Sequence, residues 1–399
     1  MSIQAGGPID PGLPPASPRR LAPDLARGAM LLLIAMAYAG VYAGGGFGTD
    51  VSADPIQDRI ATLFTTLFLD NRAFPMFAIL FGYGMAWMVA RQSARGTSER
   101  EIRRLLRRRG FFLLLFGAVH AFLVFPGEIL ASYGLAALVT GRLLLCSNRT
   151  IVRAAVVFAV FYVVTVPLAF IGMNMGESQG GEVEFALPGY LTAGDWIERL
   201  VFLPFGPLFI AVAFPLLLLV VLGYLAGRAG LLDNPAAHRG LLVKVAVFGV
   251  GLSVLGAVPS ALTSLGYLSP DTVTGGLFMG AQVLTGVLGG AGYAALFALW
   301  GTRLEADPGP AVRAVAAMGK RSLTFYLLNS VLVAILLHPD LVGLGSEVGP
   351  AGALLVAALV WSISLVLAAL LAARGRPGPL DLLMRRCVHG GRAKSEARA

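Results

Sequence analysis

Long apolar runs separated by short polar segments recur along nearly the whole chain. Most runs extend for about 20 residues, which is the length of a helix that crosses a bilayer core of about 30 Å. Apolar positions are continuous and do not alternate with a period of two, so the runs predict helices and not the strands of a barrel. We therefore predict an all-α fold, a polytopic integral membrane helical bundle with about ten transmembrane helices.

The apolar runs also divide the chain into regions. Residues 1–22 are rich in Pro, Gly, Ala and Ser and predict a disordered cytoplasmic tail. Residues 23–390 form a single transmembrane helical domain, and residues 391–399 form a second cytoplasmic tail. Residues 56–69 are apolar too, and an interfacial or re-entrant helix there is an open alternative. The predicted spans are residues 28–47, 73–90, 107–125, 129–146, 151–172, 200–227, 241–266, 275–300, 318–338 and 350–373.

Charges in the loops support this arrangement. With the N-terminus inside, all but three of the 31 Lys and Arg residues fall in inside segments, the exceptions being Arg59, Arg72 and Arg199. Basic residues accumulate in the cytoplasmic loops of membrane proteins, and one missed span would scramble every later loop. The pattern predicts a multi-pass protein of the bacterial cytoplasmic (inner) membrane, with the N-terminus and the C-terminus in the cytoplasm.

The composition excludes several other classes of protein. Hydrophobic residues make up 57% of the chain and charged residues only 13%, against about 25% charged residues in soluble domains. The net charge of +9 is therefore attributed to basic residues in the cytoplasmic loops of a membrane protein. No nucleic acid partner is expected. Cys146, Cys387 and four histidines form no ligand cluster, so neither a metal site nor a disulfide is predicted. The oligomeric state stays open.

The loop at residues 91–109 is the most basic segment and carries eight arginines, among them Arg107, Arg108 and Arg109. One interpretation is a topology signal that also attracts anionic lipid headgroups, at about 1 kcal/mol for each basic residue. The other interpretation is a surface that binds the phosphates of a nucleotide-like donor. The sequence alone leaves both open.

His120 is the clearest ionisable residue predicted inside the membrane. It follows Arg109 by eleven residues, which corresponds to a depth of about 16 Å along a helix. After a turn at Pro126-Gly127, Glu128 is expected at the outer rim and Tyr133 at a depth similar to that of His120. A histidine near a carboxylate and hydroxyls is suited to general-base catalysis. A neutral histidine that bonds a neighbouring helix is the structural alternative.

Further polar groups are predicted at the edges of spans. Asp24 and Arg27 share a helix face at the inner end of the first span, because they lie three residues apart. Arg72 precedes the second span and is interpreted as an outer interfacial anchor. The polar groups expected inside or at the rim of the membrane, besides those already described, are Asp24, Arg72, Arg321, Tyr326 and Asn329.

Several segments, taken in order, are similar to a known family. They are Asp24–Gly28, Phe77–Gly84, Gly117–His120, Gly127–Gly134, Gly319–Leu327 and Gly378–Asp381. On these segments the chain resembles the YeiB-like bacterial membrane proteins, which carry a domain of unknown function numbered 418. Transport has been suggested for that family. Its pattern is also distantly similar to transmembrane acyltransferases, which move acyl groups from a cytoplasmic thioester donor to an acceptor across the membrane.

The acyltransferase resemblance implies roles for particular residues. One such group has an arginine and a histidine separated by ten residues in an early span, and Arg109 and His120 have that spacing here. They lie in the third span, however, and the first span offers Ala37 and Tyr38 at the corresponding distance from Arg27. This departure weakens the resemblance.

From this resemblance we expect a membrane acyltransferase-like protein. His120 is the expected general base, and Glu128 or Tyr133 orients it or contacts an envelope or lipid-linked acceptor. Arg27 and arginines among Arg103–Arg109 hold the phosphates of an acyl-coenzyme A donor, and no cofactor is bound tightly. The alternative is a transporter or exporter of a small molecule or lipid-linked substrate, with the same polar groups lining a pathway. A non-catalytic membrane partner is a third hypothesis.

Overall fold

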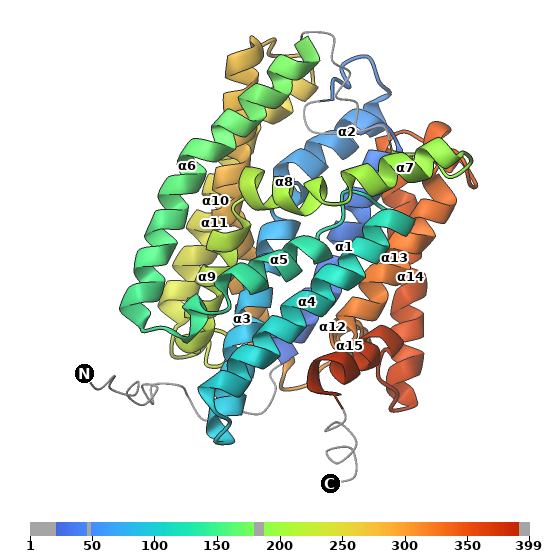
Figure 1. Cartoon of the computed structure of the whole chain (residues 1–399). Helices are drawn as coiled ribbons and strands as arrows, with labels where there is room; N and C mark the ends of the chain where they lie inside the picture. Colours follow the sequence, from blue (N-terminus) through green and yellow to red (C-terminus); the bar gives the residue numbers. More distant parts are fainter. Residues whose placement is uncertain (1–20, 46–48, 179–186, 391–399) are drawn as a thin grey trace.

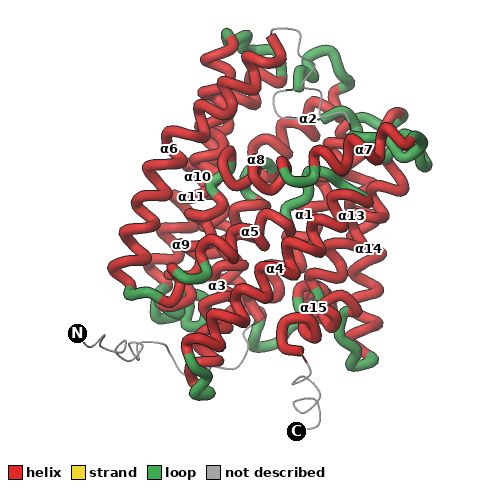
Figure 2. The backbone as a smooth tube through the Cα atoms, in the orientation of Figure 1, coloured by secondary structure: helices red, strands yellow, loops and turns green. Residues whose placement is uncertain are grey.

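The computed structural model describes residues 21–45, 49–178 and 187–390. These residues form an all-helical bundle without a strand in any of the three ranges, as Figure 2 shows. The predicted all-α class is confirmed. Most of both predicted tails lies outside the described residues, but Leu21 and Ala22, which were assigned to the first tail, already belong to the first helix.

Fifteen α-helices follow one another along the described residues, joined by short loops (Figure 1). Three short segments have other helical geometries: η1 is a π-helix, and η2 and η3 are 3-10 helices. The elements are α1 (Leu21–Tyr42), α2 (Ile56–Phe64), η1 (Thr65–Leu69), α3 (Ala73–Ala94), α4 (Glu99–Leu123), α5 (Leu130–Thr140), η2 (Leu143–Leu145), α6 (Asn148–Ser178), α7 (Ala193–Phe202), α8 (Phe205–Ala213), α9 (Leu216–Arg228), α10 (Arg239–Ser264), α11 (Thr272–Leu304), α12 (Pro310–Gly319), α13 (Ser322–Leu337), η3 (Leu344–Ser346), α14 (Pro350–Ala373) and α15 (Pro379–His389).

The bundle has the apolar outer surface of a membrane protein. Long side chains on α6, α10 and α14, such as Val157, Phe248 and Leu355, are more than half exposed although they are apolar. A bilayer would cover such a surface. Within the described residues, six continuous stretches are long and apolar enough to cross a membrane, or up to eight if each of two bent helix pairs is one span. The predicted count of about ten is not confirmed.

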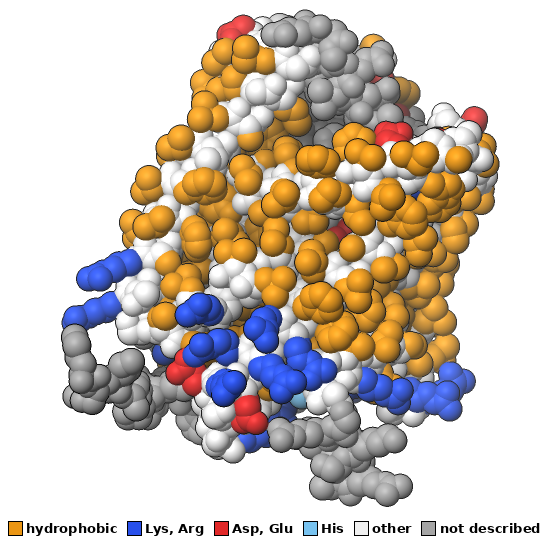
Figure 3. Space-filling model, in the orientation of Figure 1, with side chains coloured by type: hydrophobic (Ala, Val, Ile, Leu, Met, Phe, Trp, Pro, Cys, Tyr) orange, Lys and Arg blue, Asp and Glu red, His pale blue; other side chains and the backbone are white. Residues whose placement is uncertain are grey.

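Lys and Arg side chains gather at one end of the bundle, below a wide apolar band (Figure 3). This end, called the basic end here, holds the start of α1, the turn between α3 and α4, and the helices α12 and α15 (Figure 1). The grouping agrees with the sorting of charges that the sequence predicts. That the basic end faces the cytoplasm stays a prediction.

The helices α4 and α5 form a hairpin that enters the bundle from the basic end and turns back inside it. The helix α5 has 11 residues, so it extends for about 16 Å and is too short to cross a bilayer core of about 30 Å. In Figure 1 the turn between the two helices lies near mid-height. Glu128, in this turn, is 1% exposed. It therefore lies in the interior and not at the outer rim.

Residues 56–69 extend the second predicted span. They form α2 and η1, which run on into α3 as one apolar stretch, Ile56–Ala94. Arg72, at the break before α3, is 1% exposed and donates hydrogen bonds to the carbonyl oxygens of Thr66 (2.7 Å), Asp70 (2.5 Å) and Ser253 (2.5 Å). The guanidinium thus binds two carbonyls at the break, those of Thr66 and Asp70, and a third inside α10. Arg72 is an interior link to α10 and not an outer anchor.

Glycines allow the central helices to approach closely. A side chain at Gly82 in α3 would collide with the Val220 carbonyl oxygen in α9, and one at Gly223 in α9 would collide with the Ile79 carbonyl oxygen in α3. Small residues at such crossings increase van der Waals contact between helices in lipid. The helices α3 and α9 therefore pack closely against each other beside the hairpin.

The orientation of the bundle can be tested with single cysteines in a background of Cys146→Ser and Cys387→Ser. Thr97 and Asp307 lie in loops at the basic end, and Ser269 lies in the loop between α10 and α11 at the opposite end. On intact spheroplasts, a membrane-impermeant maleimide should label Ser269→Cys, and it should label Thr97→Cys and Asp307→Cys only after permeabilisation. The reverse pattern would contradict the predicted orientation.

Candidate functional site

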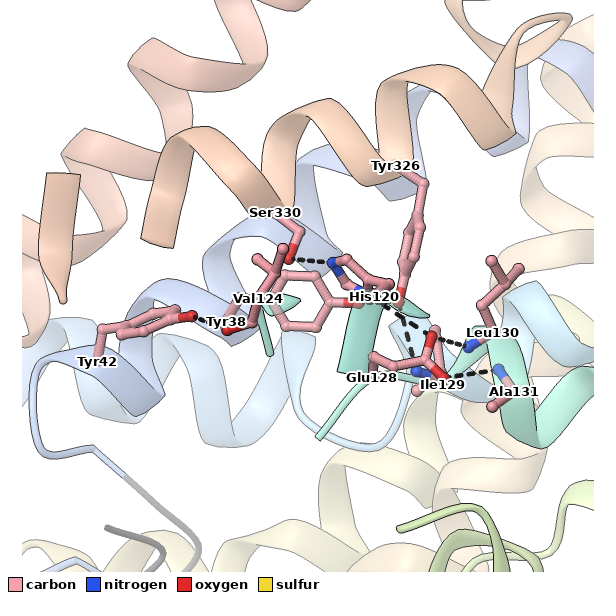
Figure 4. A network of polar contacts seen from close by, with 10 residues as sticks. All are labelled: Tyr38, Tyr42, His120, Val124, Glu128, Ile129, Leu130, Ala131, Tyr326 and Ser330. Carbon is pink, nitrogen blue, oxygen red and sulfur yellow. Dashed lines mark hydrogen bonds and ion pairs between the residues drawn. The ribbon is translucent and has the colours of Figure 1, made fainter. Parts of the chain in front are cut away.

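His120 lies near the end of α4 and is surrounded by polar groups from three elements (Figure 4). It is 4% exposed. Its Nε2 atom lies 2.9 Å from the Ser330 hydroxyl oxygen in α13, and its Nδ1 atom lies 3.7 Å from the Glu128 carboxylate. The imidazole is therefore placed between a hydroxyl and a carboxylate inside the apolar bundle.

The Glu128 carboxylate caps the first turn of α5. It accepts hydrogen bonds from the backbone N–H groups of Leu130 (2.7 Å) and Ala131 (2.6 Å) (Figure 4). The N-terminus of a helix carries partial positive charge and unsatisfied N–H groups, so it stabilises an anion. The two N–H groups therefore stabilise an ionised carboxylate in an interior where an unpaired charge would be costly.

Close packing of α4 against α5 holds the carboxylate in this place. A side chain at Gly117 in α4 would collide with the backbone of Ala131 and with the Glu128 carboxylate, and one at Gly134 in α5 would collide with the backbone of Leu114. Both glycines belong to segments that carry the family resemblance. Their lack of a side chain lets the two helices touch and places the capped carboxylate beside His120.

Two tyrosines join the hairpin to α1 and α13. The Tyr326 hydroxyl accepts a hydrogen bond from the backbone N–H of Ile129 (3.3 Å) and forms a short hydrogen bond with the Tyr38 hydroxyl in α1. The ring of Tyr326 also lies 5.7 Å from the ring of His120, centroid to centroid. Tyr326 was predicted as an intramembrane polar group, and the structure places it within this cluster (Figure 4).

Tyr133 lies in α5, and its hydroxyl bonds the backbone of α3 and not His120. It donates to the Phe74 carbonyl oxygen at 3.4 Å. Its ring stacks on Phe74, Phe77 and Phe81 of α3 at centroid distances of 5.9, 5.7 and 5.3 Å. The side chain thus contributes to an aromatic stack between α3 and α5. The structure supports contact of Tyr133 with this stack and shows no bond to the histidine.

The four arginines predicted to hold donor phosphates occupy different environments. Arg109 lies over the ring of Phe81, with its guanidinium carbon 5.4 Å from the centroid, and close enough to Arg27 that the two cations repel. Arg27 donates to the Leu80 carbonyl oxygen at 3.1 Å. Arg108 donates to the Cys387 carbonyl oxygen at 2.7 Å, and Arg107 is exposed. Of the four, Arg109 contacts the aromatic stack through Phe81, and Arg27 lies near enough to Arg109 for the two charges to interact.

The helices α1 and α4 present the same spacing of polar residues. Tyr38 follows Arg27 by eleven residues, as His120 follows Arg109. Eleven residues make about three turns and about 16 Å, so each pair lies on one face of its helix. Both helices start at the basic end (Figure 1). They therefore place two arginines at one level and the Tyr38 and His120 side chains at a deeper level.

The remaining predicted polar residues lie around this site. Arg321 donates to the carbonyl oxygens of Arg376 (2.9 and 2.6 Å) and Ala317 (2.9 Å), at the basic end, and it does not meet Asn329. Asn329 is buried, and neither of its amide atoms has a hydrogen-bond partner among the described residues. Asp24 is buried against the end of α12.

Asp381 links two helix N-termini at the basic end. Its carboxylate accepts from the backbone N–H (3.1 Å) and the hydroxyl (2.7 Å) of Thr324 in α13, while the Thr324 hydroxyl accepts from the Leu380 N–H (3.1 Å) in α15. Burial raises the pKa of Asp381, and its hydrogen bonds oppose that rise. The Gly378–Asp381 and Gly319–Leu327 segments thus meet in space and fix α15 below α13.

Two residues of the cluster, Ser330 and Tyr38, were missed as site residues. Ser330 lies four residues after Tyr326, so a search along that helix face could have found it. Tyr38 was noticed only for its spacing from Arg27. Among the described residues, no group of three or more His, Cys, Asp or Glu side chains could hold a metal ion.

The apolar outer surface and the long apolar helices identify this chain as a polytopic membrane protein, and the ionisable cluster around His120 gives it an internal polar site. Residues 226–391 match the family described as "Protein of unknown function (DUF418)". The resemblance to this family that the sequence predicts is confirmed over that region, whereas the distant resemblance to transmembrane acyltransferases is not shown. This region includes Tyr326, Ser330 and Asp381, while His120 and Glu128 precede it.

Two curated relatives extend the comparison. Over 358 residues the chain is 25% identical to the uncharacterized protein YxaH of Bacillus subtilis (strain 168), and the match covers 83% of each chain. Over 127 residues it is 31% identical to an uncharacterized 39.9 kDa protein in the amylase 3′ region of Bacillus acidopullulyticus, which is 30% of this chain and 36% of that relative. The names of these proteins state no activity, so the function is inferred from the site.

The cap on α5 can be tested by changing Glu128. Glu128→Ala leaves two buried N–H groups without acceptors, which costs about 1–3 kcal/mol for each group. We expect a clearly lower unfolding temperature in detergent, measured by the loss of monodisperse protein after heating. Glu128→Gln keeps one carbonyl oxygen and should fall between the wild type and Glu128→Ala. Wild-type stability of Glu128→Ala would show that the cap contributes nothing.

Proposed function

We propose that this protein transfers acyl groups from a thioester donor, such as an acyl-coenzyme A, to an envelope or lipid-linked acceptor. The observation that carries the proposal is the shared geometry of α1 and α4. Arg27 and Arg109 converge at the basic end, and His120 with its carboxylate partner lies about three helical turns deeper. Such a site combines arginines that can bind phosphates near the basic end with a general base deeper in the bundle.

The arginines are suited to the charged end of the donor. Guanidinium groups bind phosphate oxygens through paired hydrogen bonds, and an anion between Arg27 and Arg109 would attract both cations. From there the pantetheine-like arm of the donor would span about 16 Å to the level of His120. We place this arm alongside the stacked rings of Phe81 and Tyr133, because the Phe81 ring faces the Arg109 guanidinium.

His120 is suited to the role of general base. The Glu128 carboxylate lies on the Nδ1 side, and an ionised carboxylate only accepts hydrogen bonds, so the ring proton belongs on Nδ1. This tautomer leaves the Nε2 lone pair free to accept a proton from a hydroxyl. Such an arrangement suits deprotonation of the hydroxyl that attacks the thioester carbonyl.

Export of a substrate is supported less well. A transport pathway would have to continue past the hairpin turn toward the end opposite the basic end. Tyr42 and Tyr190 both donate to the Val124 carbonyl oxygen (3.4 and 2.8 Å), and Arg199 donates to that of Phe122 (3.3 Å). These contacts cover the turn on that side, which favours a site that opens toward the basic end.

Donor binding should depend on the two converging arginines. In the double variant Arg27→Gln/Arg109→Gln, two charge-assisted contacts of about 1.5–3 kcal/mol each are lost, so binding of acetyl-coenzyme A or palmitoyl-coenzyme A should weaken about 100-fold or more. Binding to the wild type should weaken as salt rises, because ions screen the charges. Isothermal titration calorimetry on detergent-solubilised protein measures both effects.

The matched control is Arg100→Gln/Arg104→Gln, which removes the same charge from exposed positions of α4. This variant should bind the donor nearly as well as the wild type. If both double variants lose binding equally, the basic end acts as a diffuse charged surface. If the folded wild type shows no saturable binding at low salt, the acyl-coenzyme A donor is wrong and export becomes the better hypothesis.

His120 should affect transfer more than it affects donor binding. His120→Gln keeps a hydrogen-bonding side chain but removes the base, so transfer of radiolabelled acetyl groups to envelope lipid extract should fall by about 100-fold or more. The donor dissociation constant should stay within a few-fold of the wild-type value. His338→Gln, which changes another buried histidine, should retain transfer. Full transfer by His120→Gln would exclude a base role.

A further inference from the structure

The Ser330 hydroxyl bonds a histidine of another helix and not the backbone of its own helix. In a helix, Ser and Thr usually bond the carbonyl four residues back. Several side chains in this chain do so, namely Thr140 to Ala136 (2.7 Å), Thr285 to Ala281 (2.7 Å) and Ser362 to Ala358 (2.7 Å). Ser330 forms no such bond among the described residues. Its hydroxyl, which is fully buried, is bonded to His120 alone.

The direction of that bond follows from the groups around the imidazole. With its proton on Nδ1 toward Glu128, His120 presents the Nε2 lone pair to Ser330, so the hydroxyl donates across the 2.9 Å separation. The carboxylate is in turn held by the first turn of α5. The order hydroxyl, imidazole, carboxylate is the arrangement that activates a serine nucleophile. The Ser330–His120 separation is that of a hydrogen bond, whereas the 3.7 Å between Nδ1 and the carboxylate is longer than one, as in looser sites without substrate.

We propose that Ser330 is the nucleophile that receives the acyl group, so that transfer proceeds through an acyl-serine intermediate. The inference rests on the proposed function, because the acyl group comes from the thioester donor. His120 is then the base for two hydroxyls in turn, and Glu128 is a positioning residue that acts through His120. The buried location limits water, which would otherwise hydrolyse the acyl-serine.

The two half-reactions balance without any further reagent. In the first, the Ser330 proton moves to His120 Nε2 while the serine oxygen bonds the thioester carbonyl carbon. The carbon–sulfur bond breaks, and the sulfur leaves with its electron pair and takes the proton from Nε2 as a free thiol. In the second, the acceptor hydroxyl gives its proton to Nε2 and attacks the acyl-serine carbonyl. The Ser330 oxygen leaves and recovers that proton.

The neighbouring Asn329 supports a site that awaits a ligand. Its side-chain amide is buried, and neither its nitrogen nor its oxygen has a hydrogen-bond partner among the described residues. A buried amide left without partners is costly and is uncommon in native proteins. A polar group of a ligand that reached the Asn329 side of α13 would supply such a partner; Ser330 lies on an adjacent face of the helix.

The test is covalent trapping on the full-length protein in detergent. The wild type is incubated with acetyl-coenzyme A or palmitoyl-coenzyme A without acceptor and analysed by intact-mass and peptide mass spectrometry. We expect one acyl group on Ser330, at least tenfold less in Ser330→Ala, and a similar loss in His120→Gln. Ser330→Cys should carry a thioester that neutral hydroxylamine removes. Ser364→Ala, which removes another buried hydroxyl in α14, should be acylated like the wild type.

A lipid-soluble fluorophosphonate, which labels activated serines without any donor, separates this proposal from the proposed function. Labelling of Ser330 that needs His120, in protein that binds no acyl-coenzyme A, would support the nucleophile and reject that donor. Donor binding with full transfer in Ser330→Ala would support acyl transfer and overturn the nucleophile. Absence of both acylation and fluorophosphonate labelling in folded wild-type protein would also overturn it.

Discussion

The architecture of the site depends on how a carboxylate is accommodated inside an apolar helical bundle. Glu128 is buried in the turn between α4 and α5, where an unpaired charge would be expensive. Two backbone N–H groups of α5 and the imidazole of His120 compensate it. This compensation requires a helix that starts in the middle of the bundle. The re-entrant hairpin is thus the structural device that brings a charge, and with it an oriented histidine, to this depth.

The other features of the site follow from the position of that hairpin. Because α4 starts at the basic end, the residue eleven positions before His120 is Arg109, which meets Arg27 of the parallel helix α1. Because α5 returns toward the basic end, Tyr133 stacks on Phe81, whose ring faces the Arg109 guanidinium. The helix α13 completes the cluster with Tyr326 and Ser330. Residues far apart in sequence therefore come together in a series of polar and aromatic side chains that extends from the basic end to the interior.

The sequence was sufficient for those features that depend on composition and periodicity. The all-α class, the apolar outer surface and the gathering of Lys and Arg at one end could be predicted, because each is a property of many residues. His120 was identified because an ionisable residue in an apolar run is rare. Its closeness to Glu128 was anticipated only in part, because the carboxylate was expected at the rim.

Features set by the exact ends of helices could not be predicted. Apolar residues continue past Thr140 into η2, so composition alone does not show that α5 ends there and is too short to span the membrane. Two carbonyl partners of Arg72 lie at the break before α3, and the third comes from the interior of α10. Ser330 is an ordinary serine until folding brings it to His120, 210 residues away in sequence.

The most direct test of the central claim is an electron cryo-microscopy structure of the full chain in lipid nanodiscs with a non-hydrolysable thioether analogue of an acyl-coenzyme A. The account predicts density for the donor phosphates between Arg27 and Arg109, an arm beside Phe81 and Tyr133, and the reactive carbon next to His120 and Ser330. Density for the analogue elsewhere on the bundle, or a continuous polar channel past the hairpin turn with the arginine level empty at saturating analogue, would contradict it.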